Sequence, residues 1–406
     1  MEPEDVTNGG SLGHRLQRLR KSCGLTQQSV AEALGVARTT VVGFEQGRRA
    51  VRAEELVALA ALYGRTVSDL VRILPEPDGG EPDFATQLQF RAQAEWATFT
   101  HELPAVAERL QQLAEDYRYV EHLLDAVVPN RALPTYTFDT DPVREGEDAA
   151  VAERARLNLG DGPLAGVRGL LAADLGLRVF VIDLPSKIAG MYAHDDRLGD
   201  CVAINARHPP ERQRWSMVHE AGHALHHRGA PQITLVGRQR SSKEERFAEG
   251  FACTFLMPTT GLRRRFGELR KGRAPTAADI VGLSHLYGVS FEAMCLRLED
   301  VRCLAPGTWE LLRDRGFKPH EAARVLELPK VPPEAMLPRR FVQLAVGAYQ
   351  RELLSEGQLA RLLRVDRVAA RTVVEETQTA ITVSDSGETL HRSVDLTQPL
   401  GAGDSR

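Results

Sequence analysis

Cysteine is scarce in this chain of 406 residues, which has five, and no two of them form a Cys-x-x-Cys pair. Such a set is neither a disulfide framework nor a zinc knuckle, and it indicates a reducing, intracellular environment. Aromatic residues make up only 6% of the chain, so leucine, valine and alanine must build most of its cores. No apolar run approaches the length of a membrane span, and the acidic start MEPEDVTNGG lacks the apolar stretch of a secretory signal. We therefore expect a cytoplasmic protein that does not associate with membranes.

A strong charge of either sign is also missing, because the formal net charge is only −4. This value argues against a protein whose whole surface coats nucleic acid, but it is compatible with a local basic patch. The content of 43% hydrophobic and 26% charged residues is typical of globular proteins, and the length predicts two to four domains.

The first quarter of the chain contains the clearest helical pattern. Apolar residues recur there at helical spacing and predict short helices at residues 12–22, 26–33, 37–45, 53–63 and 67–73. In the stretch LTQQSVAEALGVARTTVVGFEQGRR, Thr26 is a good N-cap for the second helix, and Gly35 supplies the tight turn before the third. This order predicts a helix-turn-helix, whose third helix presents its first residues to the major groove of DNA.

The charge of this segment fits contact with phosphates. From Leu12 to Arg52 there are eight basic residues and two acidic ones, a net charge of +6 within an acidic chain. The elements LxxLRxxxGLTQ, LGVxRTTV and ExGRR resemble the XRE/Cro-type helix-turn-helix family over about 65 residues. The residues expected to contact double-stranded operator DNA are Gln27, Arg38, Thr39 and Thr40, with Arg48 and Arg49 on the DNA backbone. The alternative is a small helical domain that binds protein.

A linker and a long helix are predicted next. The stretch PEPDGGEPD at residues 75–83 has linker composition. Apolar residues from Leu103 to Leu124 then follow a heptad pattern over three repeats. This stripe either pairs with a second copy of the chain, giving a homodimer suited to a palindromic operator, or packs on the next domain.

The stretch RWSMVHEAGHALHH contains a His-Glu-x-x-His motif. Three expected strands, RVFVID, GMYAHDD and DCVAIN, precede a helix that begins near Pro210 and includes the motif. His219 and His223 are four residues apart, so both imidazoles project from one helix face and can hold one metal ion. Glu220 lies beside that face as the candidate general base.

The third ligand must come from elsewhere. The metzincin arrangement would need Gly at 226 and His at 229, and the chain has the reverse, His226 and Gly229. A second amphipathic helix, SSKEERFAEGFACTFLMP, contains two glutamates four residues apart. We take Glu245 as the ligand and Glu249 as the carboxylate that orients a ligand histidine, with exchanged roles or Glu244 as alternatives. Such a site suits Zn²⁺, with Mn²⁺ as an alternative.

These motifs resemble the ImmA/IrrE family of metallopeptidases over roughly residues 145–300, on VAIN, RQRWSMVHEAGHALHH, EERFAEGFACTFLMP and IVGLSHLYGVSFEAMCLRL. The resemblance implies a gluzincin-like core with His219 and His223 as ligands, Glu220 as base and Glu245 in the second acidic element. One position departs from the family: Glu249 stands where asparagine is usual. The motif does not identify the group that stabilises the oxyanion, for which the candidates are Tyr192, His194 and His208.

The expected fold class is a multidomain, mainly α protein. It combines an all-α helix-turn-helix domain at residues 1–74, a linker and heptad-patterned helix at 75–130, an α+β gluzincin-like peptidase domain at 131–300, an all-α C-terminal domain at 301–376 and a flexible polar tail at 377–406.

Two functions follow as hypotheses. In the first, the chain is a DNA-targeted zinc-dependent endopeptidase that cleaves a helix-turn-helix repressor or an antitoxin-like protein, and so controls stress, mobile-element or toxin–antitoxin genes in a bacterium. The resemblance implies this substrate class. In the second, it is a non-proteolytic transcription factor whose peptidase-like domain senses a metal or ligand.

Overall fold

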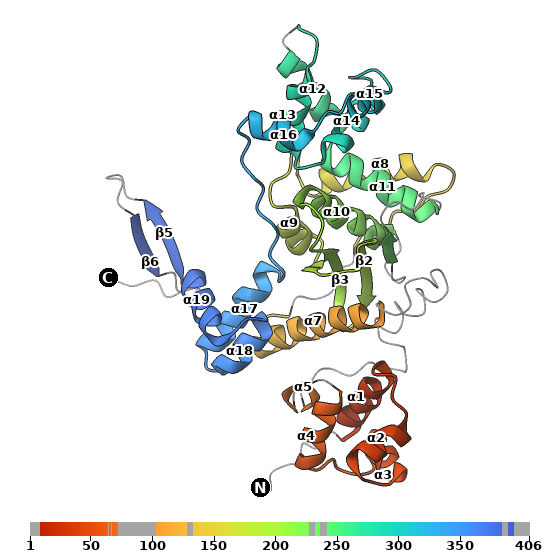
Figure 1. The fold of residues 1–406 in the computed structure, drawn as a ribbon, viewed down its shortest axis with the longest axis vertical. Coiled ribbons are helices and arrows are strands. Elements are labelled where there is room, and N and C mark those ends of the chain that lie inside the picture. Colours follow the sequence, from red (N-terminus) through yellow and green to blue (C-terminus); the bar gives the residue numbers. More distant parts are fainter. Residues whose placement is uncertain are drawn as a thin grey trace. The chain divides into compact units, whose positions relative to one another are not determined.

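The computed structural model describes residues 9–63, 65, 67–71, 103–127, 133–226, 232–235, 242–270, 272–383 and 389–393 (Figure 1). The chain divides into two compact units, Met1–Pro82 and Asp83–Arg406, and each is described by itself. The predicted linker at residues 75–83 lies outside the described residues. Among the described helices, none is both long enough and apolar enough to cross a membrane.

The N-terminal unit contains the five predicted helices, with ends that differ from the prediction by at most three residues: α1 (Gly9–Ser22), α2 (Gln27–Leu34), α3 (Arg38–Glu45), α4 (Ala53–Leu62) and α5 (Val67–Val71). Thr26 caps α2, because its hydroxyl accepts a hydrogen bond from the Ser29 N–H and the Ser29 hydroxyl accepts one from the Thr26 N–H. Gly35 takes the left-handed conformation, with φ 65° and ψ 31°, and turns the chain into α3. The core of this unit includes Leu16, Val30, Val41, Phe44 and Leu59.

Four strands form a mixed sheet in the second unit, in the order β1-β3-β2-β4. They are β1 (Arg178–Ile182), β2 (Ile188–Asp195), β3 (Gly199–Asn205) and β4 (Gln232–Leu235). Strand β1 is parallel to β3, whereas β2 is antiparallel to both β3 and β4. The first three strands coincide with the expected ones, and the short strand β4 was not predicted.

Both faces of this sheet are covered, which explains why every residue of β3 is buried. Side chains alternate between the faces, so Val179 and Val202 join one core while Phe180 and Ala203 join another. The first core includes residues of α8 (Pro142–Arg156), α9 (Val167–Asp174), α10 (Pro210–His226) and α11 (Lys243–Leu256). The second core includes residues of α7 (Leu103–Leu123), α17 (Arg339–Gln350) and α18 (Glu356–Leu363) (Figure 1).

The heptad stripe lies on α7 and packs within the chain. Leu103, Leu110 and Val120 are buried in the second core. The Tyr117 ring contacts Phe180 of β1 edge-on, with 6.4 Å between ring centroids, and Phe341 of α17 at 5.3 Å. The structure therefore confirms the second interpretation of this stripe, packing on the neighbouring domain. The stripe gives no support to a homodimer.

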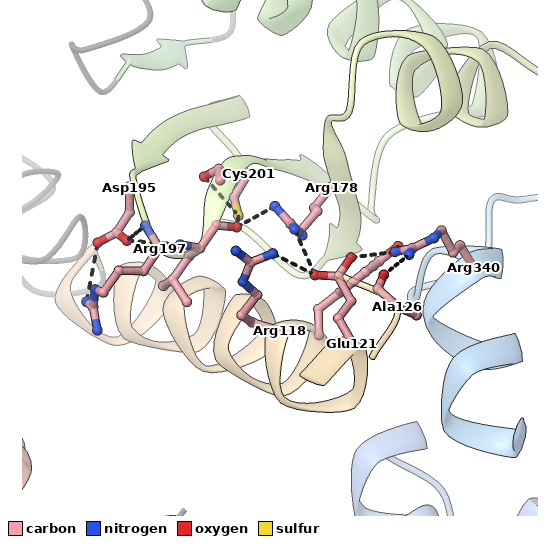
Figure 2. Close-up of polar contacts among 11 residues, drawn as sticks. Arg118, Glu121, Ala126, Arg178, Asp195, Arg197, Cys201 and Arg340 are labelled. Carbon is pink, nitrogen blue, oxygen red and sulfur yellow. Dashed lines mark hydrogen bonds and ion pairs between the residues drawn. The ribbon is translucent and has the colours of Figure 1, made fainter. Parts of the chain in front are cut away.

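A buried carboxylate joins α7 to the sheet and to the C-terminal helices. Glu121 of α7 is only 1% exposed, and Figure 2 shows arginines from three elements pointing toward it. Its Oε2 lies 3.2 Å from Nη1 of Arg118 and 3.0 Å from Nη2 of Arg178 in β1, and its Oε1 accepts a hydrogen bond from Arg340 of α17. Because removing one member of a buried charge cluster is strongly destabilising, these contacts fix α7 and α17 relative to the sheet.

The remaining helices come after α11 in the chain. They are α12 (Thr259–Arg270), α13 (Ala277–Tyr287), α14 (Phe291–Asp300), α15 (Thr308–Asp314), α16 (Pro319–Val325) and α19 (Arg367–Gln378). Within the tail that was expected to be flexible, β5 (Thr379–Val383) and β6 (Thr389–Ser393) pair antiparallel. The prediction missed this hairpin, although the β-branched stretch TAITV favours a strand. The segments 384–388 and 394–406 lie outside the described residues.

Candidate metal centre and DNA-binding surface

The predicted DNA-contact residues of the helix-turn-helix lie at the surface of the N-terminal unit. Arg38 and Thr39 are exposed at the start of α3, and Thr40 is half-buried. Gln27, at the start of α2, donates from Nε2 to Oε2 of Glu45 at 3.0 Å and accepts at Oε1 from Nη2 of Arg38 at 3.4 Å. Glu45 is in turn held by a buried ion pair with Arg20, at 2.6 Å. This network orients Gln27 and Arg38 along one open hollow that also includes Thr26 and Gln28.

The two arginines after α3 have different surroundings. Arg48 is exposed, whereas Arg49 donates two hydrogen bonds to Glu55, at 3.0 and 2.9 Å. These bonds lower the pKa of Glu55. Arg49 therefore has much of its charge neutralised within the domain, and a contact with the DNA backbone remains a prediction for both residues.

Helices α10 and α11 bring the predicted metal-binding side chains together. His219 and His223 are buried on one face of α10, with 3.2 Å between their Nε2 atoms. Glu245 lies in the first turn of α11, which Ser242 caps. Its Oε2 is 3.3 Å from Nε2 of His219, and its Oε1 is 3.3 Å from Nε2 of His223. One ligand atom from each of the three residues falls within 4.8 Å of the others, an arrangement that could hold a metal ion.

Glu249 lies on the other side of the first imidazole, one turn further along α11. Its Oε2 is 3.6 Å from Nδ1 of His219, whereas the Glu245 carboxylate faces the Nε2 atoms. This geometry favours Glu245 as ligand and Glu249 as the group that orients His219, over the exchanged assignment.

The electrostatics of the cluster favour a cation. Burial lowers the pKa of His219, but the carboxylates of Glu245 and Glu249 outweigh this and raise that pKa to about 10. Burial raises the pKa of Glu245, but hydrogen bonds from the two imidazoles outweigh this and hold that pKa well below its usual range. The two carboxylates thus stabilise positive charge at the imidazoles, as a proton or a metal ion would supply. The donor set of two imidazoles and a carboxylate fits Zn²⁺.

The predicted base, Glu220, is completely buried. Neither of its carboxylate oxygens has hydrogen-bonding geometry with a partner among the described residues. Burial raises its pKa to about 8, and His219 and Thr234 of β4 oppose this only in part. A buried polar group without a partner is costly and points to a functional role.

Two glycines, which sequence reasoning missed, make room for these side chains. A Cβ atom at Gly190 of β2 would lie 2.5 Å from Oε1 of Glu220, so glycine lets the strand pass beside this carboxylate without displacing it. A Cβ atom at Gly222 of α10 would lie 3.0 Å from the Cα of Ala248, so Gly222 allows α10 and α11 to approach closely. The one available signal was Gly222 itself, a helix-breaking residue inside the motif.

The candidates for oxyanion stabilisation have other contacts. The Tyr192 hydroxyl donates to Oδ1 of Asp200 at 2.7 Å, and Nδ1 of His194 lies 2.8 Å from the same oxygen. His208 precedes α10, whose start at Pro210 is nine residues, about 13 Å along the helix, from His219. The structure therefore does not bring His208 to the metal ligands, and it binds Tyr192 and His194 to a buried aspartate.

Together these features define the class, a helix-turn-helix protein with a metallopeptidase-like domain. Residues 11–72 match the family model of a helix-turn-helix domain, and residues 172–299 match the Peptidase_M78 model, an IrrE N-terminal-like domain. The chain thus joins a helix-turn-helix domain to an IrrE N-terminal-like domain, which confirms both resemblances found in the sequence. The gluzincin-like core remains a prediction, since the fold is mainly helical with a small mixed sheet.

Individual relatives are more distant. An uncharacterized HTH-type transcriptional regulator, YobD of Bacillus subtilis, is 34% identical over 64 residues, which are 16% of this chain and 57% of that protein. Two solved structures of ComR align over 91% of the chain, with a TM-score of 0.15 each. The ComR from Streptococcus suis is 8% identical and covered to 94%, and the apo form from S. thermophilus is 10% identical and covered to 96%. TM-scores this low are no evidence of a shared fold.

Proposed function

We propose that this chain is a DNA-binding regulator whose IrrE N-terminal-like domain is a zinc-dependent endopeptidase. Its substrate is a helix-turn-helix repressor or an antitoxin-like protein. One observation carries the proposal: Glu220 is fully buried, has no partner with hydrogen-bonding geometry among the described residues, and lies next to the cluster of His219, His223 and Glu245. A site that only stabilised the fold would gain nothing from this additional buried carboxylate.

The residues of the chain would divide the work as follows. His219, His223 and Glu245 would hold the ion, and Glu249 would orient His219. When bound, zinc supplies a Lewis acid that lowers the pKa of water and polarises a peptide carbonyl. Glu220 would accept the proton of the attacking water and deliver it to the leaving amine, a role that requires its ionised form. Burial alone disfavours that form, and the positive charge of a bound ion beside it would favour it.

The helix-turn-helix domain would place this activity at an operator. A protease held on DNA meets a repressor bound nearby at a high effective concentration, without a tight contact of its own. The exposed Arg38 and Thr39 at the start of α3 support such DNA binding.

The test compares the N-terminal proteomes of cells that express the wild type, Glu220→Gln or a control, Glu292→Gln, which alters an exposed carboxylate in the first turn of α14. We expect a new N-terminus within a repressor or antitoxin in wild-type and control cells only, with DNA binding and zinc content unchanged in Glu220→Gln. Cleavage that persists in Glu220→Gln would contradict the proposal.

The second candidate is a non-proteolytic regulator whose domain senses a metal. The additional carboxylate of Glu249, 3.6 Å from Nδ1 of His219, favours it, because it strengthens cation binding and makes a bound metal a weaker Lewis acid. In that case Glu220→Gln leaves reporter output unchanged, whereas Arg38→Ala abolishes it.

A further inference from the structure

The turn between α18 and α19 repeats the turn between α2 and α3 at a constant offset of 329 residues. Helix α2 begins at Gln27 and α18 at Glu356, and both have eight residues. Helix α3 begins at Arg38 and α19 at Arg367, so the offset is the same on both sides of the turn. A longer helix precedes each of these helix pairs: α1 comes before α2, and α17 comes before α18.

The two first helices begin in the same way. Ser355 caps α18 as Thr26 caps α2, and each accepts a hydrogen bond from the backbone N–H three residues later. The side chain of that third residue, Ser29 or Gln358, accepts a hydrogen bond from the cap's own N–H, at 2.9 and 2.7 Å. Both units thus have a complete capping box at equivalent positions.

The turns themselves have the same geometry. Gly35 has φ 65° and ψ 31°, and Arg364 has φ 59° and ψ 36°. The next residue donates to the carbonyl five residues earlier in both cases, Val36 to Ala31 and Val365 to Ala360, each at 3.0 Å. A non-glycine residue in this region costs roughly 1–2 kcal/mol, so packing of the two helices must hold the turn at Arg364.

The buried faces also coincide. Val30 and Leu359 occupy equivalent positions and are buried, and Ala31 and Ala360 follow them. In the second helix of each unit the fourth residue, Val41 or Ala370, is fully buried. These positions fix the angle between the helices of a helix-turn-helix, so the agreement extends from the backbone to the packing.

A left-handed turn between two helices is not sufficient for DNA binding, as α13 and α14 show. Gly288 joins them with φ 62°, but Phe291 at the start of α14 packs against Trp309 and Phe317, with ring centroids 5.9 and 4.9 Å apart. The start of α19 differs, because Arg367 is exposed and Val368 is 72% exposed.

The exposed chemistry of α19 fits duplex DNA. Arg367 stands at the position of Arg38, and its guanidinium lies over the first turn of α18, where it would contact a Cβ at Gly357 at 3.4 Å. Val368 offers an apolar group of the kind that contacts thymine methyls. From Ser355 to the end of α19 at Gln378 there are four arginines and four acids, so the two helices together have no net charge. Arg364 and Arg371 are paired with Asp116 and Glu356, so the charge offered to DNA is that of Arg367 in the first turn of α19.

We propose that α17, α18 and α19 form a second helix-turn-helix unit, and that the first turns of α19 bind the major groove of duplex DNA. The chain then has two DNA-binding surfaces, one in each compact unit. This proposal does not depend on peptidase activity.

The test uses the full chain and a fluorescent 30-base-pair duplex of random sequence, with affinity measured by anisotropy at several salt concentrations. Arg367→Ala removes one phosphate or base contact and is expected to reduce the slope of log affinity against log salt by about 0.9. Val368→Glu is expected to weaken binding further, because its carboxylate repels phosphate. The control is Arg313→Ala, at an exposed arginine of α15, and melting temperatures check that each variant is folded.

Arg38→Ala separates the two surfaces. If only Arg38→Ala lost affinity for the duplex, and Arg367→Ala and Val368→Glu bound it as tightly as the Arg313→Ala control, the proposed second helix-turn-helix unit would be overturned. A loss in Arg367→Ala and Val368→Glu only would uphold it and count against the N-terminal surface instead. Unchanged DNA binding in Val368→Glu together with loss of a co-purifying protein would make this face a protein-binding surface and would also overturn the proposal.

Discussion

Replacing Gly190 by alanine perturbs the candidate base without touching a candidate metal ligand. The added Cβ would lie 2.5 Å from Oε1, 3.0 Å from Cγ and 3.1 Å from Cδ of Glu220, where ordinary contacts begin at 3.4 Å. Because Glu220 is fully buried, its carboxylate cannot move into solvent and must shift within the site.

The expected effect is larger on catalysis than on stability. Overpacking of this kind typically costs about 1–3 kcal/mol, and the flexible end of Glu220 absorbs part of it. A displacement of roughly 1 Å in a catalytic group can cost about 100-fold in rate. We therefore expect Gly190→Ala to remain folded, to bind zinc with unchanged stoichiometry and to cleave the substrate found with the wild type roughly 100-fold more slowly.

The assays are urea unfolding, metal analysis and cleavage of that substrate. Gly169→Ala is the control, since its Cβ would meet nothing within 4 Å on helix α9, and it should stabilise the protein slightly. If Gly190→Ala cleaved as fast as Gly169→Ala, the strand β2 would not determine the position of Glu220, and this account of the site would be wrong.

Three further predictions concern the buried Glu121 cluster, the pH dependence of stability and the carboxylate of Glu249. Glu121→Gln should lower the free energy of unfolding by about 3–5 kcal/mol in urea titrations, because three arginines lose a buried counter-charge, whereas Glu292→Gln, at an exposed carboxylate of α14, should change little. In chelator, the raised pKa values of Glu220, about 8, and His219, about 10, mean that the folded state binds protons more tightly. The free energy of unfolding should then fall as pH rises from about 5 to 10, by at most about 1.4 kcal/mol per pH unit for each group. Glu220→Gln should flatten the lower part of this decline. A free energy of unfolding that rose over this range would refute the raised pKa values of the two groups. Glu249→Asn should weaken zinc binding about 10–100-fold in calorimetry, and an unchanged affinity would exclude Glu249 from orienting His219.

Local patterns in the sequence predicted what depends on neighbouring residues. The cap at Thr26, the left-handed Gly35 and the apolar spacing predicted the helix-turn-helix, because each acts within one or two helical turns. The spacing of four residues placed His219 and His223 on one helix face for the same reason. The sequence pointed to Glu245 because the second acidic helix could supply the missing ligand. Which of Glu245 and Glu249 faces the metal side of His219 was decided only by their distances to the two ring nitrogens.

The tertiary structure decided what depends on distant residues. The stripe on α7 could have faced a second chain or a neighbouring domain, and only the packing of Tyr117 on Phe180 and Phe341 showed which. Contacts between elements far apart in the chain, such as Gly190 beside Glu220, leave no periodic trace in the sequence. Periodicity reports which face of an element is buried, whereas the partner of that face is fixed by the complete fold.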